Sequence, residues 1–313
     1  MISQVVTNEV FARLGIHPLD TKLLRGYNDN VFEAGQNEKF IVKILEKSVS
    51  SELSLLAELE WLNYLHMKGI DVVKPLYING TDYIEEVNDD YYFVVFQKVN
   101  GVYVTPKDTE IWGGAFFEKW GELMGKIHSA SKNYSAKNSR PMWNDNKILI
   151  ELGALELNPQ LIQKWARYNK EFENLPISKD NFGLIHGDLH CGNLIVTNSS
   201  VYAIDFGDSE YHWFAYDIAI AIYHTALTVA QPERDEFAKR FFDAFMNGYG
   251  RGNTNTDVIK DINYFIEYRH LYSFTYHSLY ADKSQLTEQQ LKYLKNMELS
   301  LINDSPFLTV LLG

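Results

Sequence analysis

The sequence has very little cysteine and no long apolar run. Cys191 is the only cysteine among 313 residues, which excludes an internal disulfide and agrees with a reducing compartment. No apolar stretch reaches the roughly 18 residues of a membrane span. No charged leader followed by an apolar segment opens the chain. We therefore expect a cytoplasmic protein without a membrane span or a secretory signal.

Positive charge is also scarce. The 29 Lys and Arg residues stand against 41 Asp and Glu, which gives a formal net charge of −12. Nucleic-acid backbones are bound by clustered Lys and Arg, so this balance argues against a nucleic-acid partner. It is compatible with a cationic ligand, although a solvated acidic surface explains it as well and is the more common case. A hydrophobic content of 46% over this length suffices for one large core or two lobes.

Residues 184–207 carry the most informative pattern, LIHGDLHCGNLIVTNSSVYAIDFG. Two apolar runs, residues 194–196 and 201–204, are rich in β-branched side chains. The four residues between them, 197–200, favour a tight turn. This arrangement predicts a β-hairpin.

The hairpin register brings three polar side chains together. It places Asn193 opposite Ile204 and therefore beside Asp205. Facing residues in such a ladder have Cα atoms about 4.5 to 5.5 Å apart, so the Asn193 and Asp205 side chains are close enough to share a divalent ion. An amide oxygen and a carboxylate are hard ligands that suit Mg²⁺. Asp188 lies five residues before Asn193, on a loop in which Gly187 and Gly192 allow backbone angles closed to other residues. We therefore predict a metal on Asn193 and Asp205, with Asp188 as a base in the same cleft.

The run HGDLHxGN followed by IDFG resembles the aminoglycoside phosphotransferase and choline kinase superfamily, the small-molecule relatives of protein kinases. Protein kinases share the Asp-to-Asn spacing in H-R-D-L-x-x-x-N. Carried over by position, Asp188 orients or deprotonates an acceptor hydroxyl, while Asn193 and Asp205 hold Mg²⁺ on the phosphates of ATP. Gly187 and His190 replace the Arg and Lys of most protein kinases, and both departures favour the small-molecule branch.

This segment has two alternative interpretations. An ordinary turn explains the HGD motif alone, and a strand end explains the DFG motif alone. Chance local structure explains less well why both motifs occur together at a spacing that fits the family. A zinc site built from His186, His190 and Cys191 is the second alternative. Gly187 and Gly192 argue against the helix that would place both histidines on one face.

Upstream, the chain predicts a nucleotide-binding lobe. Residues 19–27, 30–34 and 39–45 are expected strands separated by turn-forming residues. Lys43 lies in the third strand among apolar neighbours, where an unpaired buried ammonium would be costly. The resemblance implies that Lys43 contacts the α- and β-phosphates. The alternative is a solvent-facing strand residue.

A partner for this lysine is expected on the next helix. Residues 51–68 carry leucines at helical spacing, and Glu58 falls on the apolar stripe they form. A carboxylate on a packing face is best explained by a cation, so we predict an ion pair between Lys43 and Glu58 that positions the phosphates. Glu52 borders the same stripe and is the second candidate.

A phosphate-covering loop is expected over residues 26–30. It contains one glycine, which makes it a weak motif by itself, but it directly precedes a strand. Backbone N–H groups from Asn28 to Asn30 are predicted to reach the β-phosphate.

The resemblance also implies an adenine site at a hinge after the strand over residues 91–96. Backbone groups near Gln97 and Val99 would bind the base, between the apolar side chains of Ile41 and Ile204. Asn100-Gly101 is alternatively a hairpin turn.

From residue 109 onward the pattern is helical, with expected helices over residues 111–128, 158–174, 215–230, 233–246, 257–280 and 287–301. Asp217 is interpreted as structural support, and Asp208 and Glu210 as surface turn residues that alternatively touch metal or a cationic substrate. The tyrosines repeated every four residues from Tyr264 are typical of core packing, or alternatively line an acceptor pocket with Glu267 and Arg269. No role is assigned to residues 132–146.

The resemblance implies an α+β, bilobal, protein-kinase-like fold. An antiparallel sheet with one main helix would form a nucleotide-binding lobe over residues 1–98. A larger, mostly helical lobe over residues 99–313 would carry the catalytic loop and the acceptor site. We expect a monomer or homodimer.

The expected activity is transfer of the γ-phosphoryl group of ATP, with Mg²⁺, to a hydroxyl of a small molecule. Acceptors in the superfamily include aminoglycosides, spectinomycin, homoserine, choline, hydroxylysine and methylthioribose. The runs GDLH and YDIAIA look most like homoserine-kinase-like and stress-response-kinase-like bacterial members, so a Ser/Thr protein kinase is the alternative. A non-catalytic nucleotide sensor is a further one, but a protein that only binds ATP has no need of Asp188.

Overall fold

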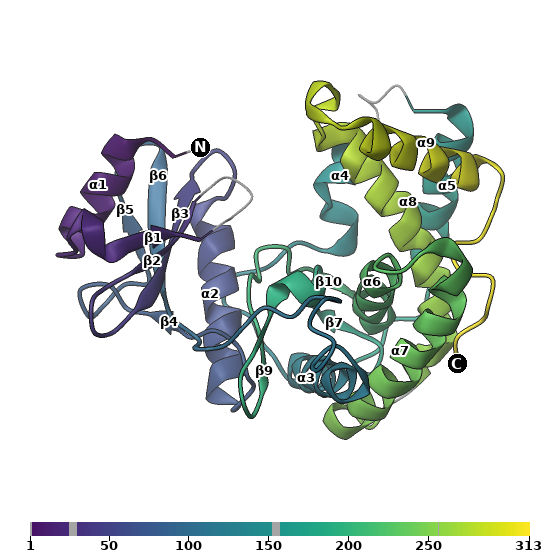
Figure 1. Cartoon of the computed structure of the whole chain (residues 1–313), viewed down its shortest axis with the longest axis horizontal. Coiled ribbons are helices and arrows are strands. Elements are labelled where there is room, and N and C mark those ends of the chain that lie inside the picture. The colour runs from purple at the N-terminus through teal and green to yellow at the C-terminus, as the bar shows by residue number, and fades with distance from the viewer. Residues whose placement is uncertain (1, 25–29, 152–156, 256) are drawn as a thin grey trace. The chain divides into compact units, whose positions relative to one another are not determined.

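The protein is described from a computed structural model that places residues 2–24, 30–151, 157–255 and 257–313. The chain divides into two compact units (Figure 1). Unit 1 comprises Met1–Val102, Tyr134–Arg140 and Ile195–Gly207, and unit 2 comprises Tyr103–Asn133, Pro141–Leu194 and Asp208–Gly313. The lobe boundary between residues 98 and 99 stays a prediction.

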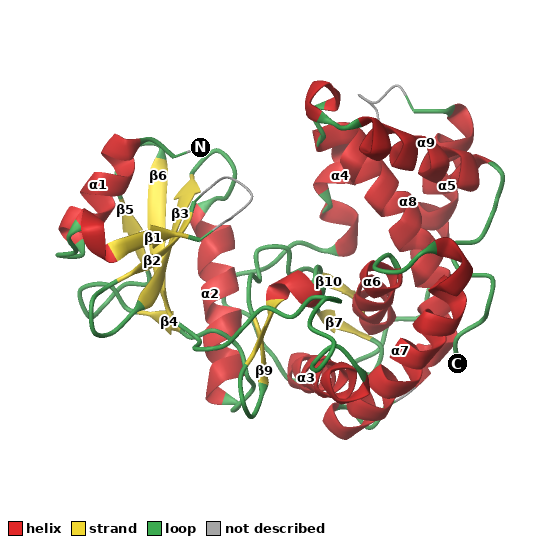
Figure 2. Cartoon of the chain, in the orientation of Figure 1, coloured by secondary structure: helices red, strands yellow, loops and turns green. Residues whose placement is uncertain are grey.

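Unit 1 is built on a six-stranded antiparallel sheet (Figure 2). Strands β1, β2, β3, β6 and β4 lie side by side in that order, and β5 also pairs with β6. The elements are α1 (Gln4–Arg13), β1 (Thr21–Leu23), β2 (Val31–Ala34), β3 (Phe40–Glu46), α2 (Glu52–Met67), β4 (Pro75–Leu76), β5 (Ile84–Glu86) and β6 (Tyr91–Gln97), with a 3-10 turn over Pro18–Asp20.

Helix α1 covers one face of this sheet (Figure 1). Its side chains Val6, Val10 and Phe11 are buried against Val42 and Ile44 of β3. Successive strand residues point to opposite faces, so the lysine between Val42 and Ile44 points away from α1. The predicted third strand is confirmed, whereas α1 was not predicted.

Helix α2 confirms the helix expected over residues 51–68. Ser51 is its N-cap, and the hydroxyl oxygen accepts a hydrogen bond from Ser54 N–H (3.2 Å). This satisfies one of the N–H groups that the first turn leaves unpaired. The buried face contains Leu55, Glu58, Leu59, Leu62 and Leu65.

The hairpin predicted around residues 197–200 is also present, as β8 (Leu194–Val196) and β9 (Val201–Ala203). Thr197 N–H donates to the Ser200 carbonyl (2.9 Å), as expected for a loop at Asn198-Ser199. Val102 forms an antiparallel bridge with Val196. Residues after Asn100-Gly101 therefore pair with β8.

Unit 2 is mostly helical, with one small sheet made of β7 and β10 (Figure 2). Its elements are α3 (Gly114–Ser131), α4 (Lys147–Glu151), α5 (Pro159–Phe172), β7 (Phe182–Leu184), β10 (Tyr211–Trp213), α6 (Phe214–Ala226), α7 (Gln231–Gly252), α8 (Ile262–Tyr280) and α9 (Glu288–Ile302). Short 3-10 turns lie at Trp143–Asp145, Cys191–Asn193, Asp257–Asp261 and Lys283–Gln285. The predicted α+β class, with an antiparallel sheet and a larger helical part, is confirmed.

Helices α3 and α7 pack with their backbones in close contact, because each has glycines in the interface. A Cβ atom added at Gly121 would overlap with the Phe245 carbonyl oxygen, and one added at Gly248 would overlap with the Glu118 carbonyl oxygen. Side chains larger than hydrogen at these points would therefore separate the helices. No helix in the placed segments has the length and apolar character that crossing a membrane requires.

Candidate active site

In unit 1, Lys43 and Asp205 form an ion pair. Lys43 Nζ donates to Asp205 Oδ1 at 2.8 Å. Asp205 has a φ of 61°, in the left-handed region that L-residues rarely adopt, while the next residue, Phe206, is fully buried. Strained backbone persists where the surroundings determine it. The buried phenylalanine therefore anchors the turn that presents the Asp205 carboxylate.

Glu58 approaches the same point. A Cβ atom added at Gly207 would lie 3.7 Å from Asp205 Oδ1, 3.9 Å from Glu58 Oε2 and 4.0 Å from Lys43 Nζ. The two carboxylates and the ammonium thus converge on one small volume. Glu58 is only 5% exposed, whereas the second candidate, Glu52, is exposed and belongs to the outer surface of α2.

Of the predicted phosphate loop over residues 26–30, the structure describes Asn30, which is bonded to the neighbour of Lys43. Asn30 Nδ2 donates to the Ile44 carbonyl (2.8 Å), and Ile44 N–H donates to the Asn30 carbonyl (3.0 Å). These two bonds hold Asn30 beside β3. Asn28 lies outside the described residues.

The residues predicted to bind adenine lie at the end of β6 and on β3 and the hairpin. Gln97 is exposed, and Val99, Ile41 and Ile204 are partly exposed. The Gln97 N–H group donates to the Lys74 carbonyl (2.8 Å). Its backbone contribution to a nucleotide would therefore come from the carbonyl oxygen.

In unit 2, the Asp188 carboxylate is held by the side chains of Arg269 and His190. Oδ1 accepts a hydrogen bond from Arg269 Nη2 (3.0 Å), and Oδ2 lies 3.3 Å from His190 Nε2. Gly192 N–H donates to His190 Nδ1 (2.9 Å), so Nε2 carries the proton that faces Asp188. Both carboxylate oxygens therefore have a fixed direction.

These contacts keep Asp188 ionised. Burial raises the pKa of the Asp188 carboxyl, but the hydrogen bond from His190 and the charge of Arg269 outweigh it and hold this pKa well below its usual range. Burial lowers the pKa of His190, and the Asp188 carboxylate reverses that effect and raises it. A carboxylate with a low pKa is a weak base, so the arrangement orients a hydroxyl better than it removes a proton.

Asp217 fixes the backbone of the loop that carries Asp188. It is fully buried and accepts hydrogen bonds from the N–H groups of His186 (3.0 Å) and Gly187 (3.1 Å) and from His128 Nε2 (3.0 Å). Tyr249 OH in turn lies 3.0 Å from His128 Nδ1. Burial raises the pKa of Asp217, but these donors outweigh it and lower the pKa. The predicted supporting role has this structural basis.

The two loop glycines are required for different reasons. Gly187 has a φ of 83°, and an added Cβ would overlap with the Asp208 carbonyl oxygen. Gly192 does not have a positive φ. The expectation that it adopts backbone angles closed to other residues is therefore wrong. Gly192 needs to be small because an added Cβ would lie 2.6 Å from His190 Cε1.

Asn193 lies in unit 2 and Asp205 in unit 1, so their shared metal remains a prediction. Asn193 Nδ2 donates to the Asp188 carbonyl (2.9 Å), which leaves the amide oxygen as the ligand atom. The zinc alternative gains no support. Within the described ranges no three His, Cys, Asp or Glu side chains are grouped as metal ligands, and the His186 and His190 rings contact the Asp188 loop.

Comparison with known proteins identifies the family. A model of the phosphotransferase enzyme family matches residues 20–253. The chain belongs to this family. It is 29% identical to amicoumacin kinase of Bacillus subtilis (strain 168) over 314 residues, which cover 96% of this chain and 92% of that protein.

Two solved structures illustrate the shared fold. Amicoumacin kinase hAmiN, solved with AMP-PNP, Ca²⁺ and Ami, is 25% identical with a TM-score of 0.88, over 98% of both chains. A choline kinase from Streptococcus pneumoniae is 13% identical with a TM-score of 0.65, over 96% of this chain and 98% of that one. The predicted superfamily, kinase-like fold and enzyme class are confirmed, and the chain is a phosphotransferase.

The hydrogen bond from Arg269 to Asp188 was not predicted, although Arg269 was named as an alternative acceptor-pocket residue. Arg269 is 7% exposed, and its guanidinium contacts Asp188 and His224 (2.9 Å) and lies over the Tyr272 ring, 5.1 Å from the centroid. Burial and the Arg269 charge lower the pKa of His224 to about 3, so His224 is neutral and accepts the bond. A signal was present, because an arginine on an apolar helix face needs a partner as much as Glu58 does.

Glu267 does not join Arg269 in this cluster. Its carboxylate accepts a hydrogen bond from Phe307 N–H (2.8 Å) and thus holds the C-terminal segment. The tyrosine stripe of α8 also divides by role. Tyr268 is buried in the aromatic core, whereas Tyr272 is partly exposed.

Glu210 is a buried carboxyl near Tyr272. It is 8% exposed and lies 3.5 Å from Asn146 Nδ2, which also lies 3.4 Å from Tyr272 OH. Burial raises the pKa of Glu210 to about 8, helped by Asp208. The expectation that Glu210 is an ordinary surface turn residue is wrong, because its side chain is buried where the chain enters strand β10, which begins at the next residue.

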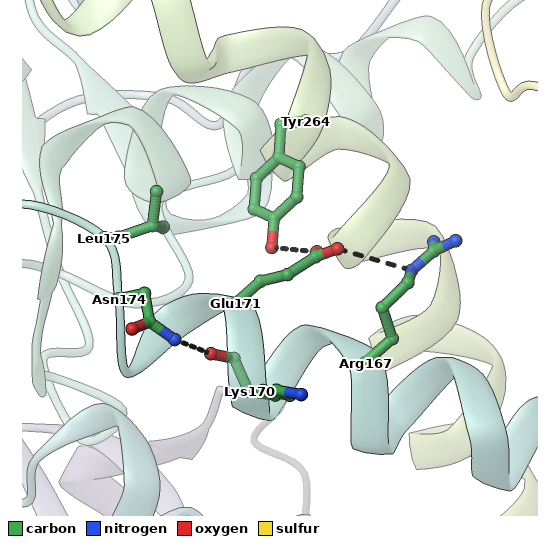
Figure 3. A pocket seen from close by; sticks show the side chains of 6 residues that line it. All are labelled: Arg167, Lys170, Glu171, Asn174, Leu175 and Tyr264. Carbon is green, nitrogen blue, oxygen red and sulfur yellow. Dashed lines mark hydrogen bonds and ion pairs between the residues drawn. The ribbon is translucent and has the colours of Figure 1, made fainter.

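A separate pocket in unit 2 has a volume of about 580 Å³ (Figure 3). Tyr264 OH donates to Glu171 (2.8 Å), and Arg167 lies 3.8 Å from the same carboxylate. Its lining residues include Tyr264, the first of the tyrosines that were alternatively expected to line an acceptor pocket. The lining residues are Arg167, Lys170, Glu171, Asn174, Leu175 and Tyr264.

Proposed function

We propose that this phosphotransferase moves the γ-phosphoryl group of ATP, with Mg²⁺, to a hydroxyl of a small molecule. The observation that carries the proposal is the Asp188 carboxylate, kept ionised and directed by Arg269 and His190. An ionised carboxylate at this place can orient an acceptor hydroxyl. A protein that only binds a nucleotide does not need such a carboxylate. Phosphoryl transfer depends mainly on positioning and charge neutralisation.

The residues of unit 1 fit the phosphate and metal end of this reaction. Lys43 has three N–H donors, so its bond to Asp205 is compatible with contacts to phosphate oxygens. Glu58 Oε2 converges with Lys43 Nζ and Asp205 Oδ1 around Gly207, which fits the proposed role of Glu58 in positioning this ammonium. Asp205 has a side chain that is 54% exposed, so a cation can reach its oxygens.

Asn193 and Asp205 are the proposed metal ligands. Both offer hard oxygen atoms, which fits Mg²⁺. When bound, Mg²⁺ neutralises charge on the transferred phosphates. The amicoumacin kinase complex that contains AMP-PNP and Ca²⁺ supports this use of a nucleotide and a divalent ion.

The acceptor is proposed to carry an amine as well as the reacting hydroxyl. Asp188 connects through Arg269 and Tyr272 to Asn146 and Glu210, within one unit. A carboxyl beside an aromatic ring suits an ammonium group. Bringing a cation next to Glu210 favours its ionised form, so binding would release a proton. Amicoumacin, named in the relatives, is the first acceptor to test.

The decisive experiment measures magnesium-dependent ADP release against a panel of hydroxyl acceptors and proteins. The panel includes amicoumacin, aminoglycosides, choline and homoserine. We expect turnover with at least one small molecule and near-complete loss in Asp188→Ala and Asp205→Ala. Asp257→Ala is the matched control, because this side chain is 77% exposed and forms a surface ion pair with Lys260, three residues further along the chain.

Three outcomes would contradict the proposal. Unchanged turnover in Asp188→Ala would remove its assigned role. Release of ADP with protein acceptors alone would favour the protein kinase alternative. Nucleotide binding without turnover on any acceptor would favour the sensor alternative.

A further inference from the structure

Residues 134–140, for which the sequence suggested no role, form part of unit 1. We name them the strap. Tyr134 begins it and packs on two aromatic side chains of α2. Its ring centroid lies 4.6 Å from that of Trp61 and 4.9 Å from that of Tyr64. Aromatic pairs at such distances add stability beyond the area they bury.

The middle of the strap is bonded to the same helix. Asn138 N–H donates to Glu60 Oε2 (3.2 Å), and Asn138 Nδ2 donates to Glu60 Oε1 (3.1 Å). Glu60 therefore receives two bonds from one residue. The strap follows α2 from its third turn back toward its beginning.

Arg140 ends the strap and is almost fully buried, with 5% of its surface exposed. Its Nη1 donates to the carbonyl (3.0 Å) and the hydroxyl (3.1 Å) of Ser54 in the first turn of α2. Its Nη2 donates to the Gly207 carbonyl. A buried guanidinium is costly unless its N–H groups are bonded, so these acceptors are held firmly in place.

Ser54 and Gly207, which accept these bonds from Arg140, belong to the two segments that build the phosphate end of the site. Ser54 lies one turn before Glu58 on α2, and Gly207 lies two residues after Asp205. A Cβ atom added at Gly207 would be within 4.0 Å of both carboxylates and of Lys43 Nζ. The distance between α2 and residues 205–207 therefore decides whether these three charged groups converge.

We propose that Arg140 is a positioning residue, which clamps α2 to the Asp205–Gly207 segment and so sets the spacing of Lys43, Glu58 and Asp205. The inference rests on the proposed function of those three residues. A guanidinium suits the task because its rigid planar fork reaches both acceptors at once, whereas a lysine ammonium is a point charge on a flexible stem. Lysine at this position should therefore hold one acceptor only.

The test compares Arg140→Lys and Arg140→Ala with Asn138→Ala. Asn138 lies on the same strap and bonds to Glu60 of α2, so its variant reports the loss of strap packing without loss of the clamp. For each protein we would measure the Kd for ATP with and without Mg²⁺ by calorimetry, the melting temperature, and kcat with the KM values for ATP and acceptor.

A displacement of about 1 Å in a reacting group costs roughly a hundredfold in rate. We accordingly expect Arg140→Lys and Arg140→Ala to weaken ATP binding about tenfold or more and to lower kcat about tenfold to a hundredfold. The KM for the acceptor should not change. Guanidinium chloride at low millimolar concentration should partly restore ATP binding to Arg140→Ala, and it should have no such effect on Asn138→Ala.

The outcomes separate this inference from the proposed function. If the wild-type protein neither binds ATP nor transfers phosphate, the proposed function fails. If the wild type does both and folded Arg140→Lys retains its Kd for ATP and its kcat, the clamp is refuted. Equal losses in Asn138→Ala and Arg140→Lys would also refute it, because they would assign the effect to strap packing. If Arg140→Ala does not fold, Arg140→Lys and Ser54→Ala, which removes one acceptor, carry the test.

Discussion

Replacing Asp217 by alanine would remove the support of the Asp188 loop. The carboxylate is fully buried and receives three hydrogen bonds, from His128, His186 and Gly187. Each bond to a buried charged group contributes about 1.5–3 kcal/mol. Breaking a buried pair by removing one partner costs about 3–5 kcal/mol, and we expect Asp217→Ala to lose stability in this range.

The same estimate can be expressed as a melting temperature. For a unit of about 150–250 residues, 1 kcal/mol corresponds to roughly 2–4 °C. Asp217→Ala should therefore lower the melting temperature of unit 2 by about 6–20 °C. Asp217→Asn keeps the shape but turns an NH₂ group toward one of the donors, so its loss should be smaller, about 1–3 kcal/mol.

The catalytic effect should exceed what partial unfolding explains. Below the melting transition, movement of the Asp188 loop should lower kcat by roughly a hundredfold in Asp217→Ala. Calorimetry gives the melting temperature, and ADP release at low temperature gives kcat. Asp243→Ala, at an exposed position of α7, is the control. Wild-type melting together with wild-type kcat in Asp217→Ala would refute the reasoning.

Three further predictions concern unit 2. Gly121→Ala should lower the melting temperature, because its Cβ would overlap with the Phe245 carbonyl oxygen and overpacking costs about 1–3 kcal/mol; an unchanged melting temperature would contradict the close helix packing. Glu210 has a pKa raised from 4.5 to about 8, so the folded protein binds the proton of this carboxyl more tightly than the unfolded chain does. The unfolding free energy should therefore fall as pH rises from about 4.5 to 8, by up to about 1.4 kcal/mol per pH unit. Glu210→Gln should flatten this slope in urea titrations at several pH values, and an unaltered slope would disprove the assignment. Arg269→Lys should lower kcat about tenfold at unchanged Kd for ATP, since a point charge cannot replace the fork that directs Asp188; a wild-type kcat would show that Arg269 is dispensable.

Local patterns allowed the hairpin, the strand of Lys43 and the helix of Glu58 to be predicted, because turn-forming residues, apolar alternation and helical spacing act between near neighbours. Helix α1 was missed because its apolar positions Val6, Val10 and Phe11 are few. The predicted strand over residues 19–27 is short in the described part because Pro18 begins a 3-10 turn instead. The ends of helices and strands depend on capping residues and on packing against distant segments, which a short stretch of sequence does not contain.

Sequence alone therefore determined the family, the chemical types of the site residues and their order along the chain. Tertiary structure decided their partners. Lys43 pairs with Asp205, 162 residues away, and Asp188 with Arg269, 81 residues away. Arg140 has its acceptors 86 and 67 residues away. A charged residue at a position that the sequence pattern predicts to be buried indicates that a partner is needed, because burying an unpaired charge is costly. Which partner it meets depends on contacts between distant segments, and those form only when the chain is folded.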